Sequence, residues 1–230
     1  MQPPDRHFAL VAFRKRGDLR FLGHLDLARA IDRAVRRAGL PVKYSQGFNP
    51  AAQIGFASAL PVGVAGEREL CQIELERPMT AAEVLRALGP QLPQDLGIVE
   101  VSVVSGPRRK HLSGLTRADY LVEFECTEGL DSAILSAAVA ELLAEPSVII
   151  ARETSTRTRE VDIRPGIHAL EVAAPADPEA APRLRMSLAL EQESLVKPGE
   201  VVEVLLHRIP GLAEGRVDAV VRRVTRLAVH

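Results

Sequence analysis

Apolar residues in the first half of the chain recur with two different spacings. Residues 24–39 carry apolar side chains three or four positions apart, which is the spacing of a helix buried on one face. Residues 7–13 instead form a mainly apolar run, rich in aromatic and branched side chains, and a turn at Gly17-Asp18 follows it; this pattern predicts a strand. The same criteria predict the order strand, helix, strand, strand, helix, strand for residues 7–13, 24–39, 53–59, 69–76, 80–88 and 98–104.

The second half of the chain has a similar alternation of patterns. Helices are predicted at residues 130–144 and 197–206, and strands at residues 120–126, 148–152, 159–163, 168–173, 184–190 and 217–229. Each half has the element order of a split-βαβ, or ferredoxin-like, unit. We therefore expect an α+β fold of two tandem ferredoxin-like units with antiparallel sheets. The units are expected at residues 1–106 and 118–230, with a basic linker at residues 107–117.

The composition is that of a globular protein, with 47% hydrophobic and 26% charged residues, which excludes disordered and collagenous chains. Residues 1–6 lack the features of a secretory signal, and no apolar stretch reaches the about 20 residues of a membrane span. We therefore expect a cytoplasmic protein with no membrane partner. Cys71 and Cys126 fall in separate predicted strands, where we expect both thiols to be buried. Because there is no cluster of three cysteines, we expect no iron–sulfur centre, and the sequence predicts no metal and no cofactor.

Positive charge is concentrated near the start of the chain. The first 50 residues contain ten Lys and Arg against four Asp, whereas the whole chain has a net charge of −1. Four arginines fall on one arc of the predicted helix, opposite its apolar face: Arg29, Arg33, Arg36 and Arg37. Guanidinium groups pair with phosphate oxygens through two hydrogen bonds, so this arc is a candidate track for a phosphate backbone. The alternative is a solvated face, because this chain uses arginine in preference to lysine and can place it on any surface.

Two polar loops with aromatic residues flank the same helix, at residues 14–21 and 43–50. Aromatic rings in a polar, glycine-containing loop favour a surface on which unpaired bases stack. The alternative is that Tyr44 and Phe48 cover the edge of the core while Asn49-Pro50 makes a turn. The residues that we assign to a nucleic-acid site are Arg14, Lys15, Arg16, Arg20, Arg29, Arg33, Arg36, Arg37, Lys43, Tyr44, Gln46, Phe48 and Asn49.

The loops and the helix also contain motifs that resemble a known family. These motifs cover residues 15–26, with Gly23-His24-Leu25-Asp26 at their end, residues 36–41, and residues 44–50, with Gln46-Gly47-Phe48-Asn49-Pro50. They are similar to a bacterial radical-SAM-associated family of unknown function, and residues 56–63 and 159–165 resemble it as well. The resemblance implies a stand-alone member of this family, a radical-SAM enzyme as partner and a connection to RNA metabolism or modification. It implies no reaction.

Three functions are compatible with these patterns. The first is a non-enzymatic RNA-binding or accessory protein that works with a radical-SAM or RNA-processing enzyme. The second is a metal-independent RNA-processing enzyme or enzyme subunit, in which His24 would take a proton from a 2′-hydroxyl and cations would stabilise the developing charge. The third is an adaptor that docks another protein. Asp162 and Arg164 form a further candidate pair, which we interpret as a structural ion pair on one face of a strand.

Overall fold

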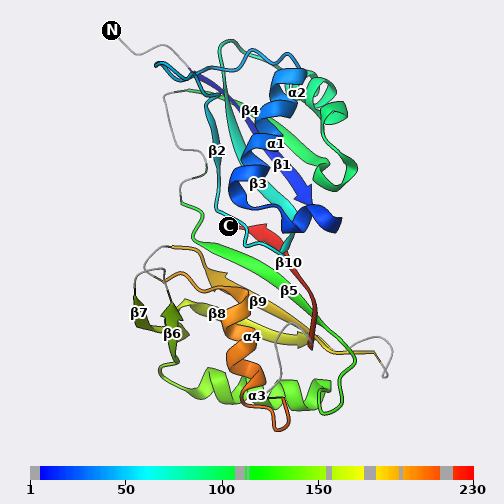
Figure 1. Cartoon of the computed structure of the whole chain (residues 1–230), viewed down its shortest axis with the longest axis vertical. Helices are drawn as coiled ribbons and strands as arrows, with labels where there is room; N and C mark the ends of the chain where they lie inside the picture. The colour runs from blue at the N-terminus through cyan, green and yellow to red at the C-terminus, as the bar shows by residue number, and fades with distance from the viewer. Residues whose placement is uncertain are drawn as a thin grey trace. The chain divides into compact units, whose positions relative to one another are not determined.

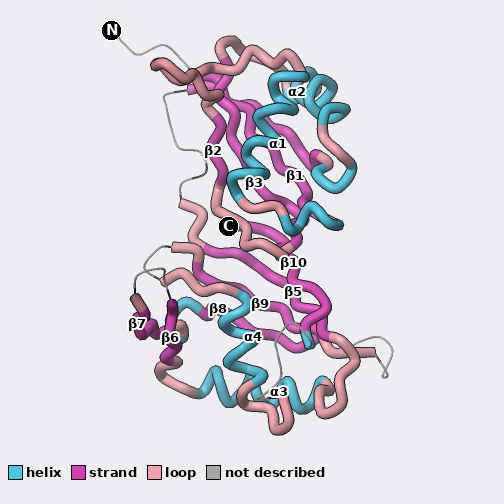
Figure 2. The backbone as a smooth tube through the Cα atoms, in the orientation of Figure 1, coloured by secondary structure: helices cyan, strands magenta, loops and turns pink. Residues whose placement is uncertain are grey.

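The computed structural model describes residues 6–106, 112, 114–153, 157–173, 180–191, 194–212 and 220–230. In these residues the protein is a mixed α/β protein with antiparallel strand pairs and four α-helices (Figures 1 and 2). The chain divides into two compact units: unit 1 is Met1–Leu115 with Val229, and unit 2 is Thr116–Ala228 with His230. Of the predicted linker, residues 107–111 and 113 lie outside the described part.

Unit 1 has the predicted order of elements. Its strands and helices are, in chain order, β1 (Arg6–Lys15), α1 (His24–Arg37), β2 (Ile54–Phe56), β3 (Ala65–Leu75), α2 (Ala81–Leu88) and β4 (Ile98–Gly106). The strands lie in the order β4-β1-β3-β2, and every neighbouring pair is antiparallel. The apolar run in β1 and the helical spacing in α1 therefore correspond to real elements, to within a few residues at each end.

The core of unit 1 lies between its helices and one face of its sheet. Alternate residues of β1 belong to one buried cluster with the apolar stripe of α1: Ala9, Val11, Phe13, Leu27, Ile31 and Val35. Helix α2 starts with a capping box at Thr80, where the Glu83 carboxylate accepts a hydrogen bond from the Thr80 backbone N–H at 2.7 Å. No described helix is long and apolar enough to cross a membrane.

The two cysteines lie in different environments. Cys71 is buried in the core of unit 1, and this burial raises the pKa of its thiol to about 12. The prediction that Cys126 is also buried is wrong: the strand that precedes it ends at Phe124, and the Cys126 side chain is exposed.

Unit 2 repeats this order with one insertion. Its elements are β5 (Arg117–Phe124), α3 (Ser132–Ala144), β6 (Ile149–Glu153), β7 (Thr158–Asp162), β8 (Ile167–Ala173), β9 (Arg183–Ala189), α4 (Pro198–Leu206) and β10 (Val221–Val229). Strands β6 and β7 form a separate two-stranded sheet, while the others lie in the order β10-β5-β9-β8. Arg152 of β6 holds this hairpin to α4, because its guanidinium donates two hydrogen bonds to the Glu200 carboxylate, at 2.9 and 2.7 Å.

One face of the unit 2 sheet is covered and the other is open. Ala118, Tyr120 and Val122 of β5 are buried, whereas Asp119 and Leu121, which point to the opposite face, are only half-buried. Helix α3 contacts β8, and α4 lies over the same sheet (Figure 1). The polar side chains of the open face are therefore accessible to a ligand.

Candidate nucleic-acid interface

Three exposed arginines follow one stripe of α1. Arg29, Arg33 and Arg36 are spaced by four and three residues, so they project from the same side of the helix, opposite its buried stripe. Arg37 lies next to them, where its guanidinium donates a hydrogen bond to the backbone carbonyl of Gln91 at 2.7 Å. Arg33 has no hydrogen-bond or ion-pair partner among the residues that the structure describes. The predicted arc is therefore a single exposed surface.

Two of these arginines share their charge with an acid of the same helix. Arg29 lies 3.1 Å from Asp26 and Arg36 lies 2.9 Å from Asp32, and all four side chains are at least partly exposed. The hydrogen bond to Asp32 raises the pKa of the Arg36 guanidinium above its usual value. Exposed ion pairs within a helix are weak because water screens them, so a phosphate group can displace the aspartates.

Lys15 does not belong to this surface, contrary to the prediction. Its side chain is only 1% exposed, and its ammonium donates hydrogen bonds to the backbone carbonyls of Arg20 and Leu22 at 3.0 and 2.8 Å. The alternation of β1 turns Lys15 inward, beneath the turn at Gly17–Phe21. Its charge therefore fixes that turn instead of contacting a ligand.

Three further predicted cations are paired with glutamates of β3. Arg14 and Arg16 both bind Glu67, and Arg16 does so through two hydrogen bonds. The side-chain hydrogen bond to Glu67 is the main cause that raises the pKa of the Arg16 guanidinium above its usual value. Lys43 lies 3.4 Å from the buried carboxylate of Glu74. Like Arg29 and Arg36 of α1, these three cations already have a carboxylate partner, whereas Arg33 has none among the described residues.

An aromatic residue and two aliphatic residues are exposed at the start of α1. The Arg20 guanidinium lies 4.4 Å from the centre of the Phe21 ring, and the Phe21 side chain is 55% exposed. The backbone N–H of Gly63 donates to the carbonyl of Arg20 at 3.0 Å, which brings Val62 to this end of the helix. Val62 and Leu25 are both exposed. The sequence analysis missed them, and the only signal was their presence in the motifs at residues 15–26 and 56–63.

The second loop is closed by its own backbone and presents one ring to solvent. The backbone N–H of Ser45 donates to the carbonyl of Ala51 at 2.8 Å, while the exposed tip of the loop carries Gln46, Phe48 and Asn49. Phe48 is fully exposed, so the alternative that it covers the core is wrong. Tyr44 does pack against the core, and its ring lies 5.2 Å from the Arg36 guanidinium.

Seven accessible residues thus follow α1 from one end to the other. We call them the α1 strip: Arg20, Phe21, Arg29, Arg33, Arg36, Arg37 and Phe48. The Arg20–Phe21 pair stands at the amino end of the helix, and Arg36 beside Tyr44 connects its carboxyl end to the loop that carries Phe48. The strip thus has four arginines on a helix of 14 residues and one exposed aromatic ring in the segment on each side of it.

His24 has, among the residues that the structure describes, no partner that would make it a general base. It is the exposed first residue of α1, and its ring packs edge-on against Phe56 with 5.3 Å between ring centres. Among the described residues no acid or base forms a hydrogen bond with His24, and no three His, Cys, Asp or Glu side chains are close enough to hold a metal ion. Within the described ranges His24 therefore packs against Phe56 and has no partner for proton transfer.

Asp162 and Arg164 are structural, although they do not form the predicted ion pair. The Asp162 carboxylate accepts hydrogen bonds from the backbone N–H groups of Val148 and Arg164, at 2.9 and 3.0 Å. The bond from Val148 is the main cause that holds the pKa of Asp162 below its usual value. The Arg164 guanidinium donates to the carbonyl of Leu143 at 3.0 Å, at the end of α3. Both side chains therefore stabilise backbone turns.

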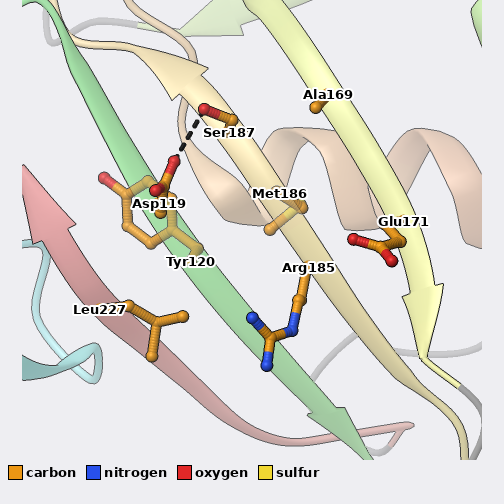
Figure 3. A pocket seen from close by; sticks show the side chains of 8 residues that line it. All are labelled: Asp119, Tyr120, Ala169, Glu171, Arg185, Met186, Ser187 and Leu227. Carbon is orange, nitrogen blue, oxygen red and sulfur yellow. Dashed lines mark hydrogen bonds between the residues drawn. The ribbon is translucent and has the colours of Figure 1, made fainter. Parts of the chain in front are cut away.

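The open face of unit 2 carries a shallow cavity that the sequence analysis did not identify (Figure 3). Its volume is about 220 Å³, and its polar lining residues are Asp119, Glu171, Arg185 and Ser187. The Ser187 hydroxyl donates to one Asp119 oxygen at 2.7 Å, and the His230 ring nitrogen lies 2.9 Å from the other. Burial is the largest single influence and acts to raise the pKa of Asp119, but these two hydrogen bonds and the positive charges of His230 and Arg117 together hold the pKa below its usual value.

The fold is similar to that of a chain of known structure. A chain in the crystal structure of a Cbf5-Nop10-Gar1 complex is 12% identical with a TM-score of 0.53, and the match covers 96% of this chain and 48% of that one. A chain in the crystal structure of the archaeal box H/ACA sRNP Nop10-Cbf5 complex is 13% identical with a TM-score of 0.44, over 95% of this chain and 46% of the other. The protein thus spans about half the length of the solved chains it matches.

The protein is therefore a mixed α/β protein whose fold is similar to part of a larger chain, that of the Cbf5-Nop10-Gar1 complex. The protein belongs to the family described as "Uncharacterized protein conserved in bacteria (DUF2344)", whose sequence profile matches residues 9–198. No curated protein matches the chain. The family description names no radical-SAM enzyme, so that association stays a prediction of the resemblance.

Proposed function

We propose that the protein binds single-stranded RNA through the α1 strip, as a non-enzymatic accessory protein of a radical-SAM or RNA-processing enzyme. The observation that carries this proposal is the arginine stripe of α1, in which Arg33 has no partner among the described residues. Arg29 and Arg36 are paired with the partly exposed aspartates Asp26 and Asp32, and Arg36 also lies against the Tyr44 ring. Guanidinium groups in such a position can exchange a weak carboxylate partner for a phosphate.

Single-stranded RNA fits the strip better than a duplex. Phe21 and Phe48 are exposed rings near opposite ends of α1, a helix about 21 Å long. Exposed aromatic rings stack on bases that are not paired, while arginines between them contact the connecting phosphates. A duplex keeps its bases stacked inside, so it would use the arginines alone.

We also propose that both units are ferredoxin-like. Their strand orders, β4-β1-β3-β2 and β10-β5-β9-β8, support this because the same element order produces the same pairing in each, once the β6–β7 hairpin is set aside. The likeness to a chain of the Cbf5-Nop10-Gar1 complex supports a fold and not a ligand. The RNA proposal therefore rests on the α1 strip.

One observation favours the adaptor as a second candidate. Phe21, Leu25 and Val62 are exposed apolar side chains at the same end of α1, which is typical of a surface that docks another protein. Apolar docking and phosphate binding respond differently to salt, because only phosphate contacts release counterions.

A salt series on the full chain separates the two functions. We expect the affinity for a labelled single-stranded RNA of about 12 nucleotides to fall about 50-fold between about 50 and about 200 mM salt, as for about four phosphate contacts. Fluorescence anisotropy measures this change. An RNA affinity too weak to detect at the lower salt concentration would contradict the proposal and leave the adaptor as the better explanation.

A further inference from the structure

The open face of unit 2 contains charged groups that have no role in the proposed α1 strip. Antiparallel register places Glu171 of β8 directly opposite Arg185 of β9, and Asp119 of β5 directly opposite Ser187 of β9. All four side chains therefore point to the same face of the sheet, around the cavity of about 220 Å³. Figure 3 shows them on three neighbouring strands. Leu227 lies on β10, which is next to the β5 strand of Asp119 and on the side of β5 opposite β9.

Arg185 and Glu171 do not neutralise each other, although they are cross-strand neighbours. No ion pair joins them within 4.0 Å, and neither has a hydrogen-bond partner among the described residues. In Figure 3 the Arg185 guanidinium points toward the side of Leu227, away from the Glu171 carboxylate. The cavity thus offers a fork of N–H donors and a carboxylate acceptor that are separate from each other.

The other lining residues of the cavity include a paired carboxylate, two small side chains and an apolar one. Both Asp119 oxygens already accept hydrogen bonds, from Ser187 and His230, so this carboxylate is held in place and is less available to a ligand. Ala169 and Ser187 are small, which leaves room for a planar ring on the sheet surface, and Leu227 adds an apolar contact. The volume is below the range usual for drug-sized ligands, so it suits one planar group better than a whole nucleotide.

We propose that this cavity binds one guanine base of a single-stranded RNA. Guanine has two neighbouring acceptors, O6 and N7, to which an arginine donates two hydrogen bonds, and its N1–H and amino group donate to a carboxylate. Arg185 and Glu171 supply these two partners. Adenine has only N7 as an acceptor on that edge, and uracil and cytosine have no N7, so guanine satisfies both side chains best.

The inference deepens the proposed function and rests on it for the choice of RNA as the ligand. The preference for guanine depends only on the cavity of unit 2. We expect the full chain to bind an oligouridine with one central guanosine about tenfold more tightly than the plain oligouridine, in line with one good base contact. R185Q and E171Q each remove one partner of the base. Both should reduce the preference to about onefold to threefold and leave the oligouridine affinity unchanged.

The matched control is R183Q, because Arg183 lies two residues before Arg185 on the same face of β9 and does not line the cavity. R183Q should keep the full preference. A variant that loses both the preference and the far-ultraviolet circular dichroism spectrum of the folded protein does not support the site. If R185Q behaves in this way, it is replaced by R185K, which keeps the positive charge but not the two parallel N–H donors of the guanidinium.

A second measurement keeps the cavity testable without the α1 strip. Titration with 5′-GMP should shift NMR signals of Glu171, Arg185 and Ser187, and 5′-AMP, 5′-CMP and 5′-UMP should shift them much less. Oligouridine binding without any guanosine preference, together with equal shifts for all four nucleotides, would overturn the guanine site and leave the proposed function intact. Loss of all RNA binding with shifts specific to 5′-GMP would contradict the proposed function and support the cavity.

Discussion

The variant R29A/R33A/R36A will bind single-stranded RNA about 50-fold more weakly than the wild type at about 150 mM salt, with nearly unchanged thermal unfolding. Each phosphate contact to a single strand multiplies the affinity by a factor that varies as about the inverse 0.7 power of the salt concentration, and three contacts are removed. Asp26 and Asp32 lose their partners at the same time, so their charges then repel the RNA. The arginines are exposed, which is why the folded state loses little. Fluorescence anisotropy and circular dichroism measure the two effects.

A matched control uses three other exposed arginines of unit 1. R68A/R77A/R86A removes the same charge, and Arg68 is also in an exposed ion pair, with Glu100 at 2.6 Å. Because these arginines lie outside the α1 strip, we expect an RNA affinity within about threefold of the wild type. Equal losses in the two triple variants would show that net charge, and not the stripe on α1, governs binding.

Replacing Lys15 by alanine will destabilise the protein by about 2 to 5 kcal/mol, because it leaves two carbonyls beneath the first turn without their donor. These carbonyls belong to Arg20 and Leu22, and the Lys15 side chain is 1% exposed. K15M retains most of the volume but not the hydrogen bonds, so it should also be destabilised. Urea denaturation of the full chain gives the free energy of unfolding.

K15A also distinguishes a structural role of Lys15 from a direct contact between Lys15 and RNA. If Lys15 contacted RNA, as its position in a basic loop predicts, K15A would unfold at the wild-type urea concentration and would bind RNA more weakly. A wild-type midpoint for both K15A and K15M would contradict the structural role derived from the hydrogen bonds to the turn.

The element order could be predicted from the sequence because it depends on local patterns. The helical spacing in α1, the capping box of α2 and the apolar runs of β1 and β4 each identify an element within a few residues. The separation of the β6–β7 hairpin from the main sheet was not predictable. It depends on long-range contacts such as Arg152 with Glu200, which are 48 residues apart.

The same distinction applies to the candidate sites. Helical periodicity was enough to place Arg29, Arg33 and Arg36 on one exposed stripe. It could not reveal that Arg16 is paired with Glu67, 51 residues further along the chain, or that Lys15 turns inward. The cavity on unit 2 depends on the register that joins Asp119 to Ser187 across 68 residues, and no local pattern carries this information.

The most direct test of the central claim is the location of bound RNA on the chain. RNA that contains 4-thiouridine can be cross-linked to the full protein by ultraviolet light, and the modified peptides identified by mass spectrometry. We predict cross-links at or next to Phe21 and Phe48, which are the exposed rings of the α1 strip. Efficient cross-linking that occurs only in α2 or α3, with none between residues 20 and 50, would contradict the account.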